Sequence, residues 1–317
     1  MLLSRVGDSL YWMGRYLERA EHTARLVDVA VDHGLGRASA FEGSAVERLY
    51  HSAGLDLTAQ DATALAGVAL FDLSNRNSVA SCVISARENA RQVREEISSA
   101  MWQQLNELYL RVKQMREEGS WSARTHYVSR AIIDGVRLFQ GITNGTMSHG
   151  EGWQYLEVGR FLERSATTSS LLTLFVPGGD GPTSMPEPRD QVEWVALLQS
   201  CSALEAYCRY YTADVRAERV TEFLLLNAEF PRSVRFATVR LEGALRTMAG
   251  YSSRGADGRA EPLAGRLRAS LEYAQVDEIL SDGPQAYLAG INRQCAQIHS
   301  ALYQSYVSYP IESALPA

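Results

Sequence analysis

The sequence predicts an all-α fold, a helical bundle built from two internally duplicated helical halves. Apolar residues recur at intervals of three and four along most of the 317 residues, and no useful length alternates with period two. The motif GRYLERA at residues 14–20 returns as GRFLERS at residues 159–165, 145 residues later (159 − 14). A self-match at half the chain length is typical of a duplication. We therefore expect a first helical copy over residues 1–149 and a second over 150–317, together forming one compact unit.

The composition is that of a globular protein with ample material for a core. Hydrophobic residues make up 46% and charged residues 21%. The net charge of −6 argues against a nucleic-acid partner, which requires a basic surface. Few, scattered cysteines without a CxxC pair suit a reducing compartment. Because neither a signal peptide nor a run of about 18 apolar residues is visible, we expect a cytoplasmic protein that does not contact membranes.

The first copy is predicted to contain one central helix. Residues 4–33 carry apolar side chains at alternating intervals of four and three, from Val6 through Leu17 to Val31. So wide an apolar arc is typical of a helix in the middle of a bundle. Ser78 is a candidate N-cap for a later, long helix. The other helices predicted in this copy span residues 41–52, 59–71, 78–117 and 122–144.

The second copy repeats this order. Its first helix is predicted over residues 151–176, and the proline- and glycine-rich segment 177–188 follows as a loop. Ser233 is the N-cap that corresponds to Ser78, 155 residues later (233 − 78). The run 224–226 is too short and isolated for a strand, so we interpret it as a helix end. The other helices predicted here span residues 191–214, 233–251, 262–281 and 284–307, with a loop at 255–258.

The duplicated motif places a glutamate and an arginine side by side, as Glu18-Arg19 and Glu163-Arg164. At about 100° per residue the two side chains flank the apolar stripe from opposite sides, so neighbours cannot pair with each other. Two interpretations remain. Each charge has a partner on a neighbouring helix, where a buried ion pair fixes the helix register, or the residues line a central cleft that binds a carboxylate or another anion.

Two further sets of residues have both a structural and a functional interpretation. Arg76, Asn77 and Ser78, and likewise Arg232 and Ser233, place an arginine just before a helix N-terminus. They either cap that helix or bind an anion such as a phosphate.

The second set is an amphipathic charged face, which is either solvated or a docking face for another protein. It consists of Arg87, Glu88, Arg91 and Arg94.

A metal site is not predicted. Glu18 and His22 lie four residues apart, but a di-iron helical bundle needs Glu-x-x-His motifs, and the sequence contains none. We expect neither a metal nor another cofactor, and no catalytic residue can be named.

The N-terminal run SRVGDSLYWMGRYLERAE at residues 4–21 resembles the start of the bacterial alpha-E proteins, a helical family named for a Glu-Arg motif. The stretch 87–91 and the turn 231–234 are also similar to that family. The resemblance implies association with an ATP-grasp peptide-ligase-like protein, and also with a transglutaminase-like protein and sometimes a proteasome-like peptidase. It implies a setting of peptide synthesis or modification, and no established catalytic residues.

The leading functional hypothesis is therefore a non-catalytic helical partner of an ATP-grasp ligase-like enzyme. The alternative is an enzyme, or a binder of an amino acid or peptide, that uses the Glu-Arg pairs in a central cleft between the copies. In that alternative the arginines would bind a carboxylate and the glutamates an amine. The two hypotheses differ in whether Glu18 and Glu163 are open to solvent.

Overall fold

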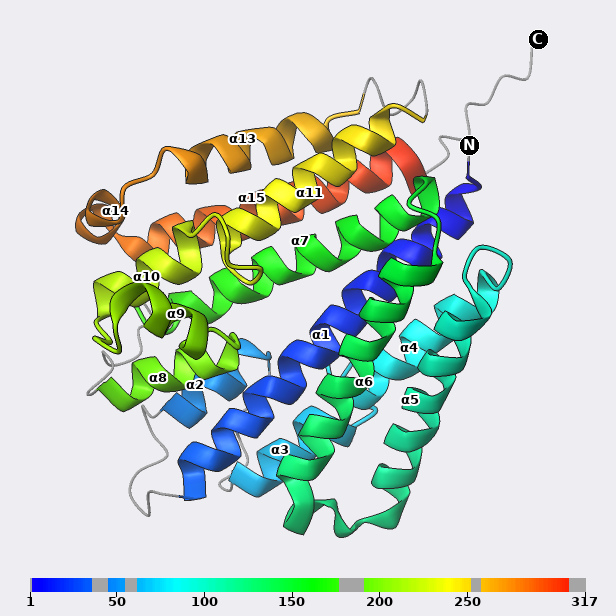
Figure 1. Ribbon diagram of the computed structural model, residues 1–317, viewed down its shortest axis with the longest axis horizontal. Helices are drawn as coiled ribbons and strands as arrows, with labels where there is room; N and C mark the ends of the chain where they lie inside the picture. Colours follow the sequence, from blue (N-terminus) through cyan, green and yellow to red (C-terminus); the bar gives the residue numbers. More distant parts are fainter. Residues whose placement is uncertain (1, 36–44, 55–61, 177–190, 252–257, 308–317) are drawn as a thin grey trace.

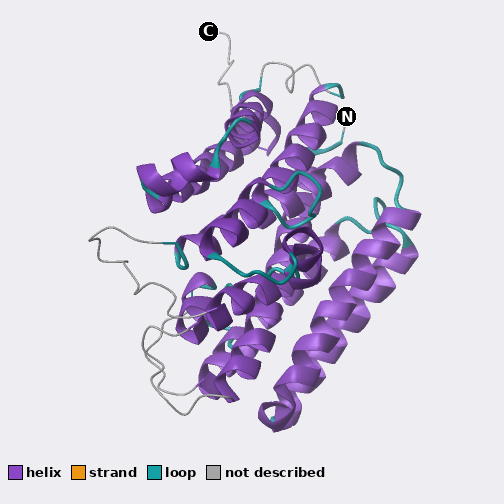
Figure 2. Cartoon of the chain, turned by 60° about the vertical axis from the view of Figure 1, so that its left-hand side comes forward, coloured by secondary structure: helices purple, strands orange, loops and turns teal. Residues whose placement is uncertain are grey.

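The computed structural model describes residues 2–35, 45–54, 62–176, 191–251 and 258–307. Helices joined by turns make up these ranges, and no strand occurs within them (Figure 2). The all-α prediction is therefore confirmed, whereas the internal duplication stays a prediction. None of the described helices combines the length and the hydropathy that crossing a bilayer requires.

The first half of the chain is arranged around one long helix, α1 (Figure 1). Helices α2, α3, α4 and α6 pack against α1, and α5 covers α4 and α6 on the outside. The bounds are α1 Ser4–Leu35, α2 Ala45–Ser52, α3 Ala62–Phe71, α4 Val79–Gln92, α5 Ser99–Glu118, the 3₁₀ turn η1 Ser120–Arg124 and α6 Thr125–Thr146.

The second half is arranged around α7 in a comparable way. Helices α11 and α15 pack against α7, and α13 covers α11 and α15. The bounds are α7 Glu151–Thr173, α8 Gln191–Ser200, α9 Leu204–Tyr211, α10 Ala217–Leu226, α11 Val234–Ala249, α13 Ala260–Glu272, α14 Val276–Asp282, α15 Pro284–Leu302 and the π-helical turn η2 Tyr303–Val307.

Helix α1 is buried over most of its length, as its apolar stripe predicts. Leu10, Met13 and Leu17 on that stripe are buried in the main hydrophobic cluster. Between residues 21 and 30 every side chain of α1 is buried, so charged residues lie inside the protein together with the apolar ones. The charges must be neutralised there by other charges.

Helices α1 and α7 pack backbone to backbone, and two glycines make this possible. A Cβ atom at Gly14 would lie 2.3 Å from the carbonyl oxygen of Leu156 on α7. A Cβ atom at Gly159 would lie 2.1 Å from the carbonyl oxygen of Tyr11 on α1. The contact is reciprocal, because the equivalent residue of each motif lies against the other helix. The first helices of the two predicted copies therefore lie directly against each other.

Both predicted serine caps are confirmed. The Ser78 Oγ accepts a hydrogen bond from the backbone N–H of Ser81 at 3.2 Å, and the Ser233 Oγ accepts one from Phe236 at 3.0 Å. Each satisfies an N–H group that has no partner inside its helix. The run 224–226 is the C-terminal end of α10, as interpreted from the sequence.

The predicted helix 78–117 is wrong, because the chain turns back after Gln92. Val93 leaves the helical conformation, and Ser98 caps a new helix by accepting a hydrogen bond from the backbone N–H of Met101 at 3.1 Å. Val93 and Ile97 in the turn are both buried. Their apolar spacing therefore continued the helical pattern through a segment that is not helical.

The predicted helix 191–214 is also two helices. The backbone N–H of Ala203 donates to the Leu198 carbonyl at 2.7 Å and that of Ser202 to Gln199 at 2.8 Å. Ser202 has a left-handed φ of 50°. This is the Schellman arrangement that ends a helix, here with serine where glycine is usual. The sequence carried no glycine to indicate it.

The remaining differences are smaller. The predicted helix 262–281 is interrupted between α13 and α14, and the helix from Pro284 changes to a π-helical turn at Tyr303. The loop 177–188, most of the loop 255–258 and the first residues of the helices predicted over 41–52 and 59–71 lie outside the described residues.

The glycine contact gives a first prediction. Gly14→Ala and Gly159→Ala should each force α1 and α7 apart and lower stability by about 1–3 kcal/mol or more, the usual cost of overpacking. Urea denaturation measures the change. Gly141→Ala in the middle of α6 is the matched control, because a Cβ atom there meets nothing within 4 Å. That change should be neutral or stabilising, since alanine favours helices by up to about 1 kcal/mol over glycine. Equal effects at all three positions would contradict the contact.

Candidate functional site

The two Glu-Arg motifs meet where α1 and α7 cross, and each glutamate pairs with the other motif's arginine. The guanidinium of Arg164 donates two hydrogen bonds to the carboxylate of Glu18, at 2.8 and 2.6 Å. Arg19 does the same to Glu163, at 2.6 and 3.2 Å. Two parallel bonds of this kind fix orientation as well as distance. The sequence-based expectation of partners on another helix is confirmed.

A second arginine joins each glutamate. Arg15, one turn before Arg19, donates to Glu163 at 2.7 Å. Arg232, in the turn before α11, donates to Glu18 at 2.9 Å. Each carboxylate therefore has two guanidinium partners, which leaves few of its lone pairs without a donor.

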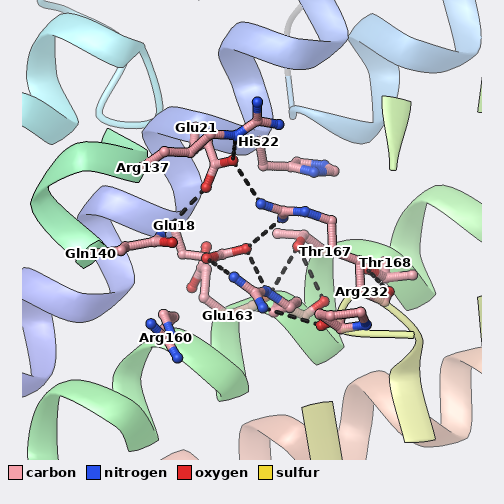
Figure 3. Close-up of polar contacts among 12 residues, drawn as sticks. Glu18, Glu21, His22, Arg137, Gln140, Arg160, Glu163, Thr167, Thr168 and Arg232 are labelled. Atoms are coloured by element: carbon pink, nitrogen blue, oxygen red, sulfur yellow. Dashed lines mark hydrogen bonds and ion pairs between the residues drawn. The ribbon is translucent and has the colours of Figure 1, made fainter. Parts of the chain in front are cut away.

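On one side the cluster extends to Glu21 (Figure 3). Arg232 binds Glu21 at 2.6 Å in addition to Glu18, so one guanidinium bridges two carboxylates on successive turns of α1. Arg25 and Arg137 also lie within ion-pair distance of Glu21, at 2.8 and 3.3 Å.

The two sides of the crossing differ at corresponding positions. The counterpart of Glu21, 145 residues later, is Ala166, and the counterpart of Arg232, 155 residues earlier, is Asn77. Asn77 accepts a hydrogen bond from Arg19 at 2.8 Å, so an amide stands where the other side has a guanidinium. The additional carboxylate, Glu21, and the additional guanidinium, Arg232, thus occur on the same side of the crossing, where they pair with each other.

The electrostatics of the cluster keep its carboxylates ionised. Burial would raise the pKa of Glu18, but the guanidinium groups of Arg164 and Arg232 outweigh it and hold the pKa well below its usual range. The pKa values of Glu21 and Glu163 are lowered in the same way by their arginine partners. A depressed pKa means that this contribution to stability is complete above about pH 4.5 and is lost as the pH falls further.

His22 lies beside the cluster and is kept neutral. Burial, together with the neighbouring charges of Arg25 and Arg232, lowers the pKa of His22 to about 3. Its Nδ1 lies 3.5 Å from Nη2 of Arg25, so that nitrogen is placed as an acceptor and the proton belongs on Nε2. His22 therefore acts as a neutral polar group next to an excess of guanidinium charge.

The geometry favours a structural role for the motif. Glu18 is 1% exposed and Glu163 is 3% exposed, and both are enclosed by their arginine partners. A carboxylate that is sealed and doubly paired is not available to a ligand. Buried ion pairs of this kind fix the register between helices.

The predicted anion sites are distributed differently from the expectation. Arg232 is occupied by Glu18 and Glu21, and Asn77 by Arg19, so both belong to the ion-pair cluster. Ser78 and Ser233 cap their helices. Arg76 is exposed and is not brought to the cluster.

The predicted docking face is retained only in part. Arg87 is half-buried, donates to Asn106 at 2.8 Å and lies over the ring of Trp102. Arg94 lies over the same ring, 4.7 Å from its centre, but from the turn after α4 and not from α4 itself. Glu88 and Arg91 form an ion pair on the surface. The face is thus a surface patch built by α4, its following turn and α5.

Sequence reasoning missed the aromatic side of the crossing. Tyr11 and His299 are hydrogen bonded at 2.7 Å, and Arg15 donates to the Tyr11 hydroxyl at 3.1 Å. Arg15 also lies over the ring of Trp12. The approach of α15 to the start of α1 is a tertiary contact without a local signal. Among the described residues, no group of three His, Cys, Asp or Glu side chains converges as metal ligands would.

Removing one arginine of the ion-pair cluster should lower the stability of the fold. Arg164→Ala leaves Glu18 buried with half of its partners and should lower stability by about 3–5 kcal/mol. Arg111→Ala, at an exposed position of α5, should change it by less than about 0.5 kcal/mol. Thermal and urea denaturation report both values. Similar small shifts for the two variants would show that the cluster does not stabilise the fold.

His22 gives a pH-dependent prediction. Its pKa is about 3 in the folded state and near 6.5 when unfolded, so the unfolded chain binds the extra proton and stability falls as the pH drops below about 6.5. Between pH 7 and pH 5 the loss due to His22 should be about 2 kcal/mol. Urea denaturation of His22→Gln at both pH values should show a smaller loss by that amount. An unchanged pH dependence in the variant would contradict a buried neutral histidine.

Comparison with known proteins identifies the family. The Alpha-E family, described as a predicted alpha-helical domain with a conserved ER motif, matches residues 2–307. An uncharacterized protein of Mycobacterium bovis is 26% identical over 333 residues, covering 94% of this chain and 35% of that protein. Uncharacterized proteins of two Mycobacterium tuberculosis strains, CDC 1551 and H37Rv, are 26% and 25% identical over the same lengths.

The chain thus spans about a third of the length of these relatives, since 35% of each is covered. Comparison with solved structures gave no significant match. The family assignment rests on nearly the whole chain, since the match covers residues 2–307. This chain belongs to the Alpha-E family.

Proposed function

We propose that this protein is a non-catalytic helical partner of an ATP-grasp peptide-ligase-like enzyme in peptide synthesis or modification. The observation that carries the proposal is the use of the family's motif. The charged residues of the two motifs pair with each other where α1 and α7 cross, Glu18 with Arg164 and Glu163 with Arg19. The motif therefore maintains a shape, and a maintained shape is what a binding partner recognises.

The proposal includes the duplication. Helix α7 is packed by α11 and α15 as α1 is packed by α4 and α6, and α13 covers its pair as α5 does. The glycine contacts and the Glu-Arg pairs at the crossing are reciprocal. Together with the repeated sequence motif, these correspondences support two copies of one helical unit that meet around a pseudo-two-fold axis.

The patch of α4, its turn and α5 is the surface that we assign to docking. Arg94 is exposed, and its guanidinium lies over Trp102. Arginine on an aromatic ring is held in place and is a common anchor of protein interfaces. The neighbouring Glu88–Arg91 pair supplies charge of both signs at the rim.

The relatives agree with a role beside other domains. In the mycobacterial proteins the matched region makes up 35% of the whole polypeptide. There the helical unit is covalently part of something larger, as a partner domain would be. The wider association with ATP-grasp and transglutaminase-like proteins follows from the family resemblance.

The alternative, a cleft lined by the Glu-Arg pairs, is not favoured by the geometry. It required Glu18 and Glu163 to face solvent, and both are enclosed by arginines. A ligand would have to displace bidentate ion pairs that lie between two helices in backbone contact.

Co-purification tests the proposal. The chain, tagged, is co-expressed with the ATP-grasp ligase-like protein from the same genome, and complex formation and ADP release are measured. We expect a stable complex and an altered rate of ADP release. Arg94→Glu should weaken the complex at least about tenfold, the usual effect of losing an interface anchor. Arg111→Glu on the outer face of α5 is the charge-matched control. If the unmutated chain forms no complex with the ligase-like protein and leaves its rate of ADP release unchanged, the proposal is refuted.

A further inference from the structure

A polar cavity of about 290 Å³ lies between α1, α6 and the junction of α8 and α9. It is separate from the docking patch and lies next to the ion-pair cluster. Its volume is near the lower end of the ~300–1,000 Å³ usual for small-molecule sites. The lining includes three arginines and three carboxylates, from Arg25, Asp28, Asp32, Arg130, Arg137 and Glu205.

Arg25 connects this cavity to the cluster. Its side chain is buried, it lines the cavity, and its Nε donates to the carbonyl of Ser200 at the end of α8 at 2.9 Å. Nη1 of Arg25 lies 2.8 Å from Oε1 of Glu21, an ion-pair contact. Among the described residues, no acceptor is aligned for a hydrogen bond from this Nη1. Burial and the charge of Arg232 together lower the pKa of Arg25 to about 10. Arg25 therefore places a buried positive charge, paired with Glu21, in the wall of the cavity.

The positive side of the cavity has further donors. Arg137 uses Nε for Glu21, at 3.3 Å, and Nη2 for the hydroxyl of Ser202, at 3.2 Å. Arg130 uses Nε for Asp28, at 3.1 Å. A guanidinium has five N–H donors, so both arginines retain donors beyond these bonds. The cluster behind them holds five arginines against three glutamates, and this excess of positive charge adds to the attraction for a carboxylate.

The negative charge of the cavity wall comes from Asp28, Asp32 and Glu205. Asp28 is paired with Arg130 and with His126. Asp32, one turn later, is 59% exposed and lies 3.8 Å from His126. Glu205 at the start of α9 is exposed. Asp32 and Glu205 are therefore the carboxylates most open to a cation inside the cavity.

Backbone strain lies at the same place. Ser202, in the turn between α8 and α9, lines the cavity with a left-handed φ of 50°. For a residue with a Cβ atom that conformation is unfavourable, and such strain concentrates at ligand sites. The strained turn holds the Ser202 hydroxyl against Arg137 and the Ser200 carbonyl against Arg25.

We propose that this cavity binds a small zwitterion, an amino acid or a short peptide, with its carboxylate on Arg130 and Arg137 and its ammonium group on Asp32 and Glu205. Charges of both signs around one small space match a ligand that carries both. A purely anionic ligand would meet the acids, and a purely cationic one the arginines. The inference goes beyond the proposed partner role, since the site is complete within this chain.

Isothermal titration calorimetry on the purified full chain tests it without any partner. The ligands are glycine, L-alanine, L-glutamate, L-lysine and L-alanyl-L-alanine. The matched comparisons are N-acetyl-alanine, alaninamide, acetate and inorganic phosphate. At least one zwitterion should bind, and its N-acetyl and amide forms should bind at least about tenfold more weakly, because each leaves a charged group of the site without a partner.

Variants locate the site. Asp32→Asn should weaken binding of the zwitterion at least about tenfold, because the carboxylate that pairs with the ammonium group is lost. The zwitterion should then bind no more tightly than its N-acetyl form. Arg130→Gln should in the same way remove the zwitterion's advantage over its amide form. Arg111→Gln on α5 is the control and should bind normally, and melting temperatures confirm that all variants fold.

Three results would overturn the inference. The first is the absence of binding by all five zwitterions up to about 10 mM, a concentration at which even a weak site is filled. The second is binding of acetate or phosphate as tight as that of the best zwitterion. The third is unchanged discrimination in Asp32→Asn and Arg130→Gln. None of these results bears on the complex with the ligase, so this inference and the proposed function can fail separately.

Discussion

The exchange of charges across the α1–α7 crossing is the interaction on which the rest of the structure depends. Gly14 and Gly159 let the two backbones touch, and at that distance the carboxylate of each motif reaches the guanidinium of the other. Burying a charge without a partner is prohibitive. The crossing therefore has one acceptable register, and every helix that packs on α1 or α7 is placed relative to it.

Specificity, more than stability, explains such a cluster. An apolar crossing of the same volume would hold the helices at least as firmly, because buried ion pairs barely repay their desolvation. Apolar faces, however, tolerate a shift by one turn. Here a shift would separate Arg164 from Glu18 and Arg232 from both of its carboxylates. The Glu-Arg pairs at the crossing thus fix the arrangement of α1 and α7, and the polar cavity beside Arg25 is where the cluster's excess of positive charge lies close to solvent.

Much of the fold could be predicted from the sequence because its signals are local. The stripe of α1, the caps Ser78 and Ser233 and the pairing of the motifs depend on spacing and repetition. The turn at Val93 could not be predicted, because buried apolar residues continue the helical pattern through it. The helix break at Ser202 could not be predicted either, because serine takes the left-handed position where glycine is usual. Of the candidate site, the motif residues were identified, whereas Arg137 comes together with Arg25 and Asp32 only through the packing of α6 on α1.

Double-mutant cycles measure directly how strongly the charges couple across the α1–α7 crossing. Glutamine replaces each charged residue of the two motifs, singly and in pairs, and urea denaturation gives the coupling energies. The account predicts couplings of about 1–3 kcal/mol for Glu18 with Arg164 and for Glu163 with Arg19, which are in contact. It predicts couplings within about 0.5 kcal/mol of zero for Glu18 with Arg19 and for Glu163 with Arg164, which are adjacent in sequence but face apart. Strong coupling within each dipeptide and none across the crossing would contradict it.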